Sequence, residues 1–231
     1  METTIYFRWW FKRNRRLVPG IPKYKNKNLP HLKMPKKIIV IGGGGHTVSS
    51  LDIIYQNKEF KVFGLVGQKK DLGNLVGNIY VKYLDKDLSK IRKKCSYAII
   101  TLGQIKNYNL RLKIFNRLKK LKFKIPVIKS KNSYVSKNTE IGDGTMIFNG
   151  AVVNSNVKIG SNCIINSKAL IEHDVKIGNN CHISTGSILN GNVEIADNCF
   201  VGSGSILREG IKIKKNSFIP MGSKIYRWSK K

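Results

Sequence analysis

The chain has 231 residues, enough for one large domain or two modest ones, and its 41% hydrophobic content is that of a folded protein. It contains no run of eighteen apolar residues, so we do not expect a transmembrane helix. The formal net charge of +30 would suit nucleic acid or an anionic membrane. However, only 9 of the 43 basic residues are arginine, and Lys, Asn and Ile are abundant, as a compositionally biased genome would produce. No nucleic-acid-binding motif occurs in the part expected to fold, so nucleic acid is not an expected partner.

Residues 1–35 form a basic, aromatic extension that we expect to be flexible. The extension lacks the apolar core and the small-residue cleavage site of a signal peptide. Residues 5–16 are either an interfacial membrane anchor, because Trp, Phe and Arg favour lipid headgroups, or part of a disordered segment. A translation start at Met34 would remove the extension altogether.

Residues 36–129 have the pattern of a small Rossmann-like parallel sheet. A β run over 36–41, a glycine turn, a helix from Thr47 to Gln56 capped by its own Thr and Ser residues, and a strand over 60–66 make one βαβ unit. The pattern then predicts a strand over 97–102, an amphipathic helix over 108–122, and a short strand over 125–128 that closes the sheet.

The glycine turn, Gly42 to Gly45 followed by His46, departs from a dinucleotide fingerprint. Thr47 replaces the last glycine, and Gly67-Gln68 stand after the second strand where an acidic residue is expected. A redox nicotinamide site is therefore not expected. Free amides at a helix N-terminus still suit a phosphate, and the alternative is a tight turn that only needs glycine.

From Val135 to Ile225 an aliphatic residue occupies every sixth position, sixteen times in succession. A period of six fits neither a helix nor a plain strand, and it predicts an all-β hexapeptide-repeat parallel β-helix over 130–226, followed by a tail over 227–231. The aliphatic side chains should point inward, and Asn and Gly after the corners tolerate left-handed backbone. β-Helices of this class are left-handed and commonly assemble as trimers.

Three cysteines lie eighteen residues apart, which is one coil of a three-sided β-helix: Cys163, Cys181 and Cys199. They should stack in one column at a strand spacing of about 4.8 Å. The column lacks the close cysteine pairs of metal sites, so we expect small buried residues in a reducing cytoplasm and no metal. A zinc hydratase on a similar β-helix needs three histidine ligands, and this β-helix has two.

Two histidines break the repeat. His173 stands where neighbouring coils have Ser155, Gly191 and Glu209, and Asp174 follows it; a histidine beside a carboxylate is suited to proton abstraction. His182 replaces an apolar residue of its column, which suggests a role at an interface. The alternative is that both are ordinary surface histidines.

Residues 36–225 resemble bacterial sugar acetyltransferases of the sialic acid O-acetyltransferase (NeuD) and UDP-4-amino-sugar N-acetyltransferase (PglD) type. The resemblance rests on the order of the domains, on Gly44-Gly45-His46, and on Ile171-Glu172-His173-Asp174 followed nine residues after His173 by His182. Hexapeptide repeats alone occur in many acyltransferases, and their combination with the glycine-histidine turn is more specific.

The resemblance implies a cytoplasmic homotrimer that transfers acetyl from acetyl-CoA to an amine or hydroxyl of a sugar or nucleotide-sugar acceptor in surface glycan biosynthesis. In that reading His173 is the general base and Asp174 orients it, while His182 and Gly191 contact acetyl-CoA. Residues of the acceptor site would be Gly43, Gly44, Gly45, His46 and Asn166. The alternative function is a non-catalytic scaffold or regulatory subunit in a polysaccharide pathway. The acceptor sugar, and the choice between nitrogen and oxygen, stay open.

Overall fold

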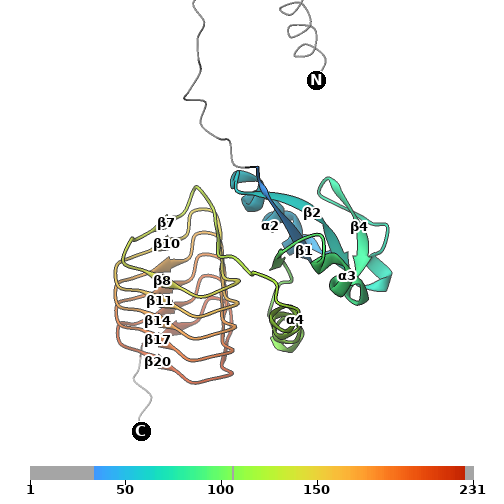
Figure 1. Ribbon diagram of the computed structural model, residues 1–231. Coiled ribbons are helices and arrows are strands. Elements are labelled where there is room, and N and C mark those ends of the chain that lie inside the picture. The colour runs from blue at the N-terminus through green and yellow to red at the C-terminus, as the bar shows by residue number, and fades with distance from the viewer. Residues whose placement is uncertain (1–33, 106, 227–231) are drawn as a thin grey trace, which may run out of the picture. The chain divides into compact units, whose positions relative to one another are not determined.

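The computed structural model describes residues 34–105 and 107–226, and the chain from Pro35 onward forms one compact unit (Figure 1). The tail over 227–231 and nearly all of the basic extension over 1–35, including the candidate membrane anchor at 5–16, lie outside the described residues. An α/β domain is followed by a parallel β-helix, which confirms the predicted fold class of an α/β domain and a left-handed β-helix.

The α/β domain is built on one five-stranded sheet in the order β3-β4-β2-β1-β5, parallel except for the β3–β4 pair. Its strands are β1 (Lys36–Ile41), β2 (Phe60–Gly67), β3 (Leu75–Val76), β4 (Ile79–Leu84) and β5 (Tyr97–Ile100). Its helices are α2 (Gly45–Gln56), α3 (Leu88–Arg92) and α4 (Asn109–Lys120), with 3-10 turns η1 (Lys69–Asp71) and η2 (Asp85–Asp87). Residues 38–41 are fully buried, as a continuous apolar strand inside a parallel sheet requires.

The start of α2 differs from the prediction. The helix begins at Gly45 and no side chain caps it, so the expectation that its own Thr and Ser would do so was wrong. The Thr47 hydroxyl instead lies 3.0 Å from that of Thr101 in the core, and Ser50 donates to the His46 carbonyl at 2.7 Å. The Thr47 and Ser50 hydroxyls are thus engaged by Thr101 and by the helix backbone. Neither caps the helix, and its first amides have no side-chain partner.

The segment over 125–128 does not close the small sheet. Lys124 forms only an isolated bridge beside Tyr97. Residues Ile128–Lys129 form β6, which pairs in parallel with Met146–Ile147 (β9) as the first strand of the β-helix. Pro126 has no amide hydrogen to donate to a sheet, so a continuous strand through it is disfavoured.

The β-helix consists of two-residue strands in three parallel sheets, ordered β22-β19-β16-β13-β10-β7, β20-β17-β14-β11-β8 and β21-β18-β15-β12-β9-β6. The strands are β7 (Tyr134–Val135), β8 (Glu140–Ile141), β10 (Val152–Val153), β11 (Lys158–Ile159), β12 (Ile164–Ile165), β13 (Leu170–Ile171), β14 (Lys176–Ile177), β15 (His182–Ile183), β16 (Ile188–Leu189), β17 (Glu194–Ile195), β18 (Phe200–Val201), β19 (Ile206–Leu207), β20 (Lys212–Ile213), β21 (Phe218–Ile219) and β22 (Lys224–Ile225). The sixth-position aliphatic residues form its core, as predicted.

Left-handed backbone marks the corners with the same period. Every sixth residue from Gly144 to Gly222 has a φ between 55° and 73°. Each of these positions is Gly or Asn except Lys168 and Asp174, in agreement with the low cost of this conformation for Gly and Asn. Asp174, beside His173, is therefore one of two exceptions to the corner pattern.

The cysteine column is a packing feature. Cys163, Cys181 and Cys199 are buried and free, and the Cys181 amide lies 3.4 Å from the Cys163 sulfur one coil earlier. Each thiol lies 3.1–3.2 Å from a backbone carbonyl of the next coil, which satisfies the weak S–H donor inside the β-helix. The predicted role as small buried residues is confirmed.

The three faces of the β-helix differ. On the β6–β21 face, Met146 and Ile164 belong to the same buried cluster as the core of the α/β domain. A charged face carries an outward row paired along the sheet: Glu140, Lys158, Lys176, Glu194 and Lys212. The third, which we call the apolar face, carries Tyr134, Val152, Leu170, Ile188 and Ile206, all exposed or half-buried.

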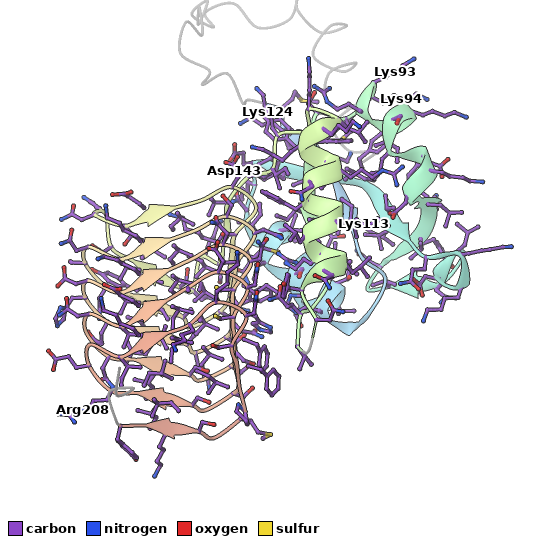
Figure 2. All side chains as sticks on the ribbon, turned by 90° about the horizontal axis from the view of Figure 1, so that it is seen from below. Lys93, Lys94, Lys113, Lys124, Asp143 and Arg208 are labelled. Atoms are coloured by element: carbon purple, nitrogen blue, oxygen red, sulfur yellow. The ribbon has the colours of Figure 1, made fainter. Side chains whose placement is uncertain are left out.

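Positive charge is distributed over both domains. Lys93, Lys94, Lys113 and Lys124 lie on the α/β domain, whereas Arg208 lies on the β-helix (Figure 2). Asp143 of the β-helix pairs with Lys119 of α4 at 3.0 Å. The net charge thus does not mark a single surface as the binding site.

Candidate active site

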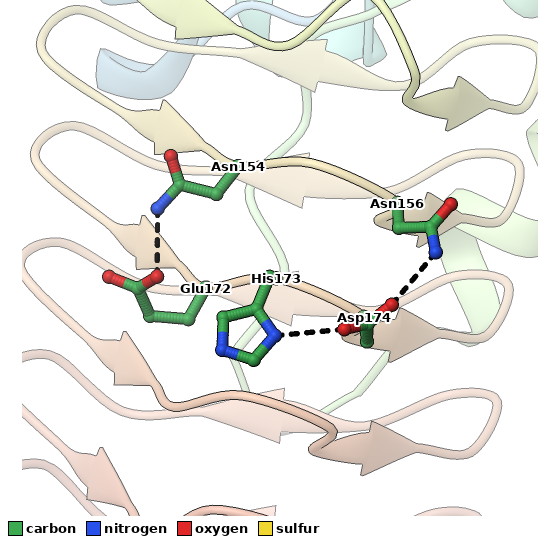
Figure 3. Close-up of polar contacts among 5 residues, drawn as sticks. All are labelled: Asn154, Asn156, Glu172, His173 and Asp174. Atoms are coloured by element: carbon green, nitrogen blue, oxygen red, sulfur yellow. Dashed lines mark hydrogen bonds and ion pairs between the residues drawn. The ribbon is translucent and has the colours of Figure 1, made fainter.

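His173 lies in the turn between β13 and β14, and its side chain is 58% exposed. Its Nδ1 is 2.8 Å from Oδ2 of Asp174 (Figure 3). The other carboxylate oxygen, Oδ1, accepts a hydrogen bond from the Asn156 amide at 2.8 Å. Glu172, on the other side of His173, accepts a bond from Asn154 at 2.9 Å. The structure thus brings together the predicted pair His173 and Asp174.

The hydrogen bond fixes the tautomer of His173. A carboxylate only accepts, so Nδ1 carries the proton and Nε2 keeps its lone pair. The bond to Asp174 raises the pKa of His173, and the charges of Asp174, Glu172 and Glu209 raise it further. The pKa of Asp174 is lowered, first by the hydrogen bond with His173 and then by that with Asn156. A histidine held in this way is suited to accept a proton through Nε2.

Gly191 lies against the His173 ring from the following coil. A Cβ atom at Gly191 would lie 2.7 Å from Cε1 and 2.8 Å from Nε2 of His173, closer than real Cβ contacts. Only glycine therefore leaves room for the imidazole in this position. Gly191 was predicted to contact acetyl-CoA, and in the structure it packs directly against the His173 ring.

His182 belongs to a second cluster, on the face that packs against the α/β domain. Its side chain is 5% exposed, its Nδ1 is hydrogen-bonded to the Gln104 carbonyl, and its Nε2 is 3.2 Å from the Asn166 amide nitrogen. Asn166 Oδ1 accepts from the Ser167 amide at 2.8 Å, which identifies the group facing His182 as the NH2. His182 therefore donates through Nδ1 and accepts through Nε2.

His46 joins this second cluster. Its ring centroid is 5.1 Å from that of Phe148 and 6.4 Å from that of His182. Burial, and then the charge of Arg111, lowers the pKa of His46 to about 4. Burial likewise lowers the pKa of His182 to about 4, so both rings are neutral at pH 7. His46 Nε2 is buried and has no hydrogen-bond partner among the described residues, so a polar ligand atom could complete it.

Two residues of this junction, Arg111 and Gln104, were not predicted from the sequence. Arg111, 1% exposed, donates through Nη1 to the carbonyls of Ile100 at 3.0 Å and Leu102 at 2.8 Å, and its Nε faces the Asn162 carbonyl of the β-helix at 3.4 Å. Gln104 donates to the Asn180 carbonyl at 2.7 Å. Together they join the carboxyl end of β5 to the β-helix. The position of Arg111 on the apolar side of the predicted amphipathic helix was the sequence feature that could have indicated its structural role.

A pocket of about 580 Å³ lies at the carboxyl ends of β1, β2 and β4. Gly43 and Gly44, two of the residues predicted for the acceptor site, line it together with residues after β2 and β4. Gly45 is the first residue of α2 and is not among the lining residues, while His46 is directed toward Phe148 and His182. Gly43 and Gly44 of the turn therefore face the pocket, whereas His46 faces the β-helix.

An acidic residue lines this pocket after all. Asp71, in η1, has its Cβ only 3.2 Å from where a Cβ of Gly43 would stand. Its Oδ2 accepts a hydrogen bond from the Gln68 amide at 2.9 Å. An acidic residue was expected directly after β2, which ends at Gly67. The structure instead brings Asp71, four residues later, to the glycine turn by means of the short 3-10 turn η1.

The predicted site residues therefore fall into three groups within one chain. His173, Asp174 and Gly191 meet at one β-helix corner, and His46, Asn166 and His182 meet at the junction of the domains. Gly43 and Gly44 line the pocket, and Gly45 belongs to none of the three groups. His182 lies on β15, in a different sheet from the strands on either side of His173, so one chain does not bring the two histidines together.

No group of three His, Cys, Asp or Glu side chains among the described residues is placed to hold a metal ion. None of the helices in ranges 34–105 and 107–226 has the length and apolarity needed to cross a bilayer.

Comparison with protein families gives three matches. Residues 37–118 match the PglD N-terminal domain. Residues 138–173 and 174–209 match the bacterial transferase hexapeptide repeat, and 192–227 match the hexapeptide repeat of succinyl-transferase. No curated protein matches the chain significantly.

Solved structures with the same fold cover both domains. PerB from Caulobacter crescentus, in complex with CoA and GDP-perosamine, is 24% identical with a TM-score of 0.76, over 83% of this chain and 89% of that one. The acetyltransferase domain of PglB from Neisseria gonorrhoeae is 23% identical with a TM-score of 0.75, over 83% and 91%. WeeI from Acinetobacter baumannii is 21% identical with a TM-score of 0.63, over 82% and 95%.

An α/β domain with a glycine-histidine turn, joined to a hexapeptide β-helix with a histidine–carboxylate corner, defines the class of hexapeptide-repeat acyltransferases. The N-terminal match narrows the class. A PglD N-terminal domain precedes the repeats in this chain, which confirms the resemblance to sugar acetyltransferases of the PglD/NeuD type that was read from the sequence.

Proposed function

We propose that this protein transfers the acetyl group of acetyl-CoA to an amine or hydroxyl of a nucleotide-activated sugar in surface glycan biosynthesis. The observation that carries the proposal is the His173–Asp174 pair at 2.8 Å, which leaves Nε2 of His173 unprotonated at an exposed corner. Support also comes from PerB, in complex with CoA and GDP-perosamine, and from the PglB acetyltransferase domain, in complex with acetyl-CoA.

The reaction proceeds by direct attack. The acceptor nitrogen or oxygen attacks the thioester carbon while His173 Nε2 takes its proton, and Asp174 stabilises the imidazolium that forms. The carbon–sulfur bond then breaks, and the CoA thiolate receives the proton from His173. A thiolate is a good leaving group, so no acyl-enzyme is required.

The junction cluster revises the role of His182. His182 was predicted to contact acetyl-CoA, but it has no free N–H for the thioester carbonyl, because its one N–H is engaged by Gln104 and its Nε2 is an acceptor. We therefore assign donation to the carbonyl to the second N–H of Asn166 or to a backbone amide. His182 then positions Asn166, and the buried Nε2 of His46 takes a polar group of a substrate.

The glycine-turn pocket holds the nucleotide phosphate of the acceptor. Its location at the carboxyl edge of a parallel sheet is the usual ligand position in open α/β folds. The N-terminus of α2, which has no side-chain cap, offers amides and a positive dipole end to phosphates, and Lys69, Lys70 and Lys86 add positive charge. The acidic Asp71 then faces polar donors of the base or ribose.

A homotrimer completes the site. The β6–β21 face is partly covered by the α/β domain and the charged face is ion-paired, whereas the apolar face has no cover within the described chain. Contiguous, partly exposed apolar surface of this kind marks an interface, and a head-to-tail contact of this face with the neighbouring β-helix that closes after three copies gives a homotrimer. His173 directly follows β13 of the apolar face, so neighbouring copies would bring a junction cluster to it.

The trimer is testable by one substitution on each of two faces. Ile188→Glu places a charge in the apolar face and is expected to yield a monomer, whereas Lys212→Glu on the charged face leaves the assembly intact. Light scattering should give three times the chain mass of 26.2 kDa for the wild type and for Lys212→Glu. A monomeric wild type would contradict the assembly.

The location of the reaction follows from the thiols. Four buried free cysteines fit a reducing compartment, so we place the enzyme in the cytoplasm. Membrane contact through residues 5–16 stays a prediction, which flotation of the full chain and of a chain starting at Met34 would test.

The function itself is tested by a substrate screen. Purified protein is incubated with acetyl-CoA and a panel of UDP-amino-sugars, GDP-perosamine and CMP-sialic acids, and mass spectrometry detects acetylated product. Acetylation of one or more compounds supports the proposal. Binding of acetyl-CoA and nucleotide-sugars by calorimetry without turnover would favour the scaffold or regulatory role instead.

A further inference from the structure

An asparagine ladder runs along one corner of the β-helix. Asn162 donates through its side-chain amide to the side-chain oxygen of Asn180 at 2.9 Å, Asn180 to Asn198 at 3.1 Å, and Asn198 to Asn216 at 3.0 Å. Each of these residues has left-handed backbone, with φ between 55° and 63°. An amide can accept from one coil and donate to the next, so the ladder continues from coil to coil.

The corner at His173 begins in the same way and then stops. Asn156 donates its amide to Oδ1 of Asp174, eighteen residues later, at 2.8 Å, and both residues are left-handed, with φ of 66° and 61°. Asp174 occupies the place of the next asparagine, but a carboxylate has no N–H to pass on. Its second oxygen is turned to His173 Nδ1 instead (Figure 3). At this second corner, the position that would continue a ladder is thus a carboxylate that bonds the histidine.

We infer that Asn156 is a positioning residue for acetyl transfer, which acts through Asp174 by holding its carboxylate in the plane that His173 Nδ1 requires. This inference rests on the proposed function for its role in catalysis, while the geometry itself needs only the two hydrogen bonds. Without Asn156, the exposed carboxylate could rotate to water, and His173 would lose its fixed tautomer.

Other charged groups near the pair also affect the pKa values of His173 and Asp174. Glu172 and Glu209 also raise the pKa of His173, and Lys176 lowers that of Asp174. Glu172 is held separately by Asn154 at 2.9 Å, so a change at Asn156 leaves it in place. The contribution of Asp174 can therefore be varied against a constant background.

The experiment replaces Asn156 by glycine, which keeps left-handed backbone unstrained and removes the amide. Asn216→Gly is the matched control, because it removes a ladder bond of the same kind at a corner without a histidine. NMR titration of the ring protons, with His173→Ala for assignment, should show the His173 pKa of Asn156→Gly falling toward 6.5 and that of Asn216→Gly unchanged. Turnover of Asn156→Gly should fall on the order of tenfold, a part of the factor that a general base supplies.

A second variant separates positioning from mere structural damage. Asn156→Asp has nearly the same shape but offers no N–H to Asp174 and repels its carboxylate, so the hydrogen bond between Asp174 and His173 should be lost as in Asn156→Gly. Loss of the Nδ1-protonated tautomer of His173 in both variants, read from the chemical shifts of the ring nitrogens, supports the inference. An unchanged tautomer in both would overturn it, even if acetyl transfer is found. If the tautomer is lost and the substrate screen of the wild type yields no acetylation, the positioning stands and the proposed function fails.

Discussion

Substitution of Gly191 by alanine tests the position of the proposed general base, His173, most sharply. The new Cβ would stand 2.7 Å from Cε1 of His173, whereas ordinary contact begins near 3.4 Å, so the ring must retreat by about 0.7 Å. Displacement of a reacting group on the order of 1 Å costs roughly a hundredfold in rate. We expect kcat of Gly191→Ala to fall by about that factor, with KM for acetyl-CoA changed much less.

The assay is release of the CoA thiol with the acceptor identified by the screen, and thermal unfolding reports whether the fold persists. Gly191 does not have left-handed backbone, so alanine adds no backbone strain and the melting temperature should change little. Ser155→Ala, at the same corner position one coil before His173, is the control and should keep normal turnover. A kcat of Gly191→Ala within threefold of wild type would refute the reasoning.

Three further outcomes are expected. Because the His173 pKa is raised above 6.5 and the base must be neutral, kcat/KM should fall as pH drops through that pKa, and in Asp174→Asn the acidic limb should move to lower pH. Buried His182 has its pKa lowered to about 4, so the unfolded chain binds more protons below pH 6.5. Stability should therefore decline between pH 6.5 and 4, by about 3 kcal/mol for this histidine, and less steeply in His182→Gln; an equal slope in chemical denaturation would contradict this. Arg111→Met leaves buried carbonyls without a donor and should lower the free energy of unfolding by about 2 kcal/mol, measured in urea, where no loss would show that the junction does not depend on it.

Most features of the β-helix could be predicted from the six-residue period of the sequence. Each repeat fixes the same local geometry, so the inward residues, the left-handed corners and the cysteine column all follow from spacing alone. The prominence of His173 came from the same regularity, since a residue that the repeat does not require has to be explained by something else. The bond between His173 and its neighbour Asp174 is local and could also be anticipated.

Contacts between distant parts of the chain could not be read in this way. Gln104 meets His182 across 78 residues, and Arg111 meets Asn162 across 51. The strand predicted over 125–128 failed for the same reason, because its pairing with β9 depends on where the β-helix begins. Asp71 was missed because a 3-10 turn, which has no strong sequence signal, returns it to the glycine turn.

The central claim is that His173 accepts the proton of the acceptor during transfer from acetyl-CoA. The direct measurement is acceptor-dependent release of CoA, with GDP-perosamine and a UDP-4-amino-sugar as probes, by the wild type and by His173→Ala under the same conditions. Our account predicts release by the wild type with at least one acceptor, and a rate lower by roughly a hundredfold or more in the variant, with acetyl-CoA binding retained. Turnover of His173→Ala within a few-fold of wild type would contradict it.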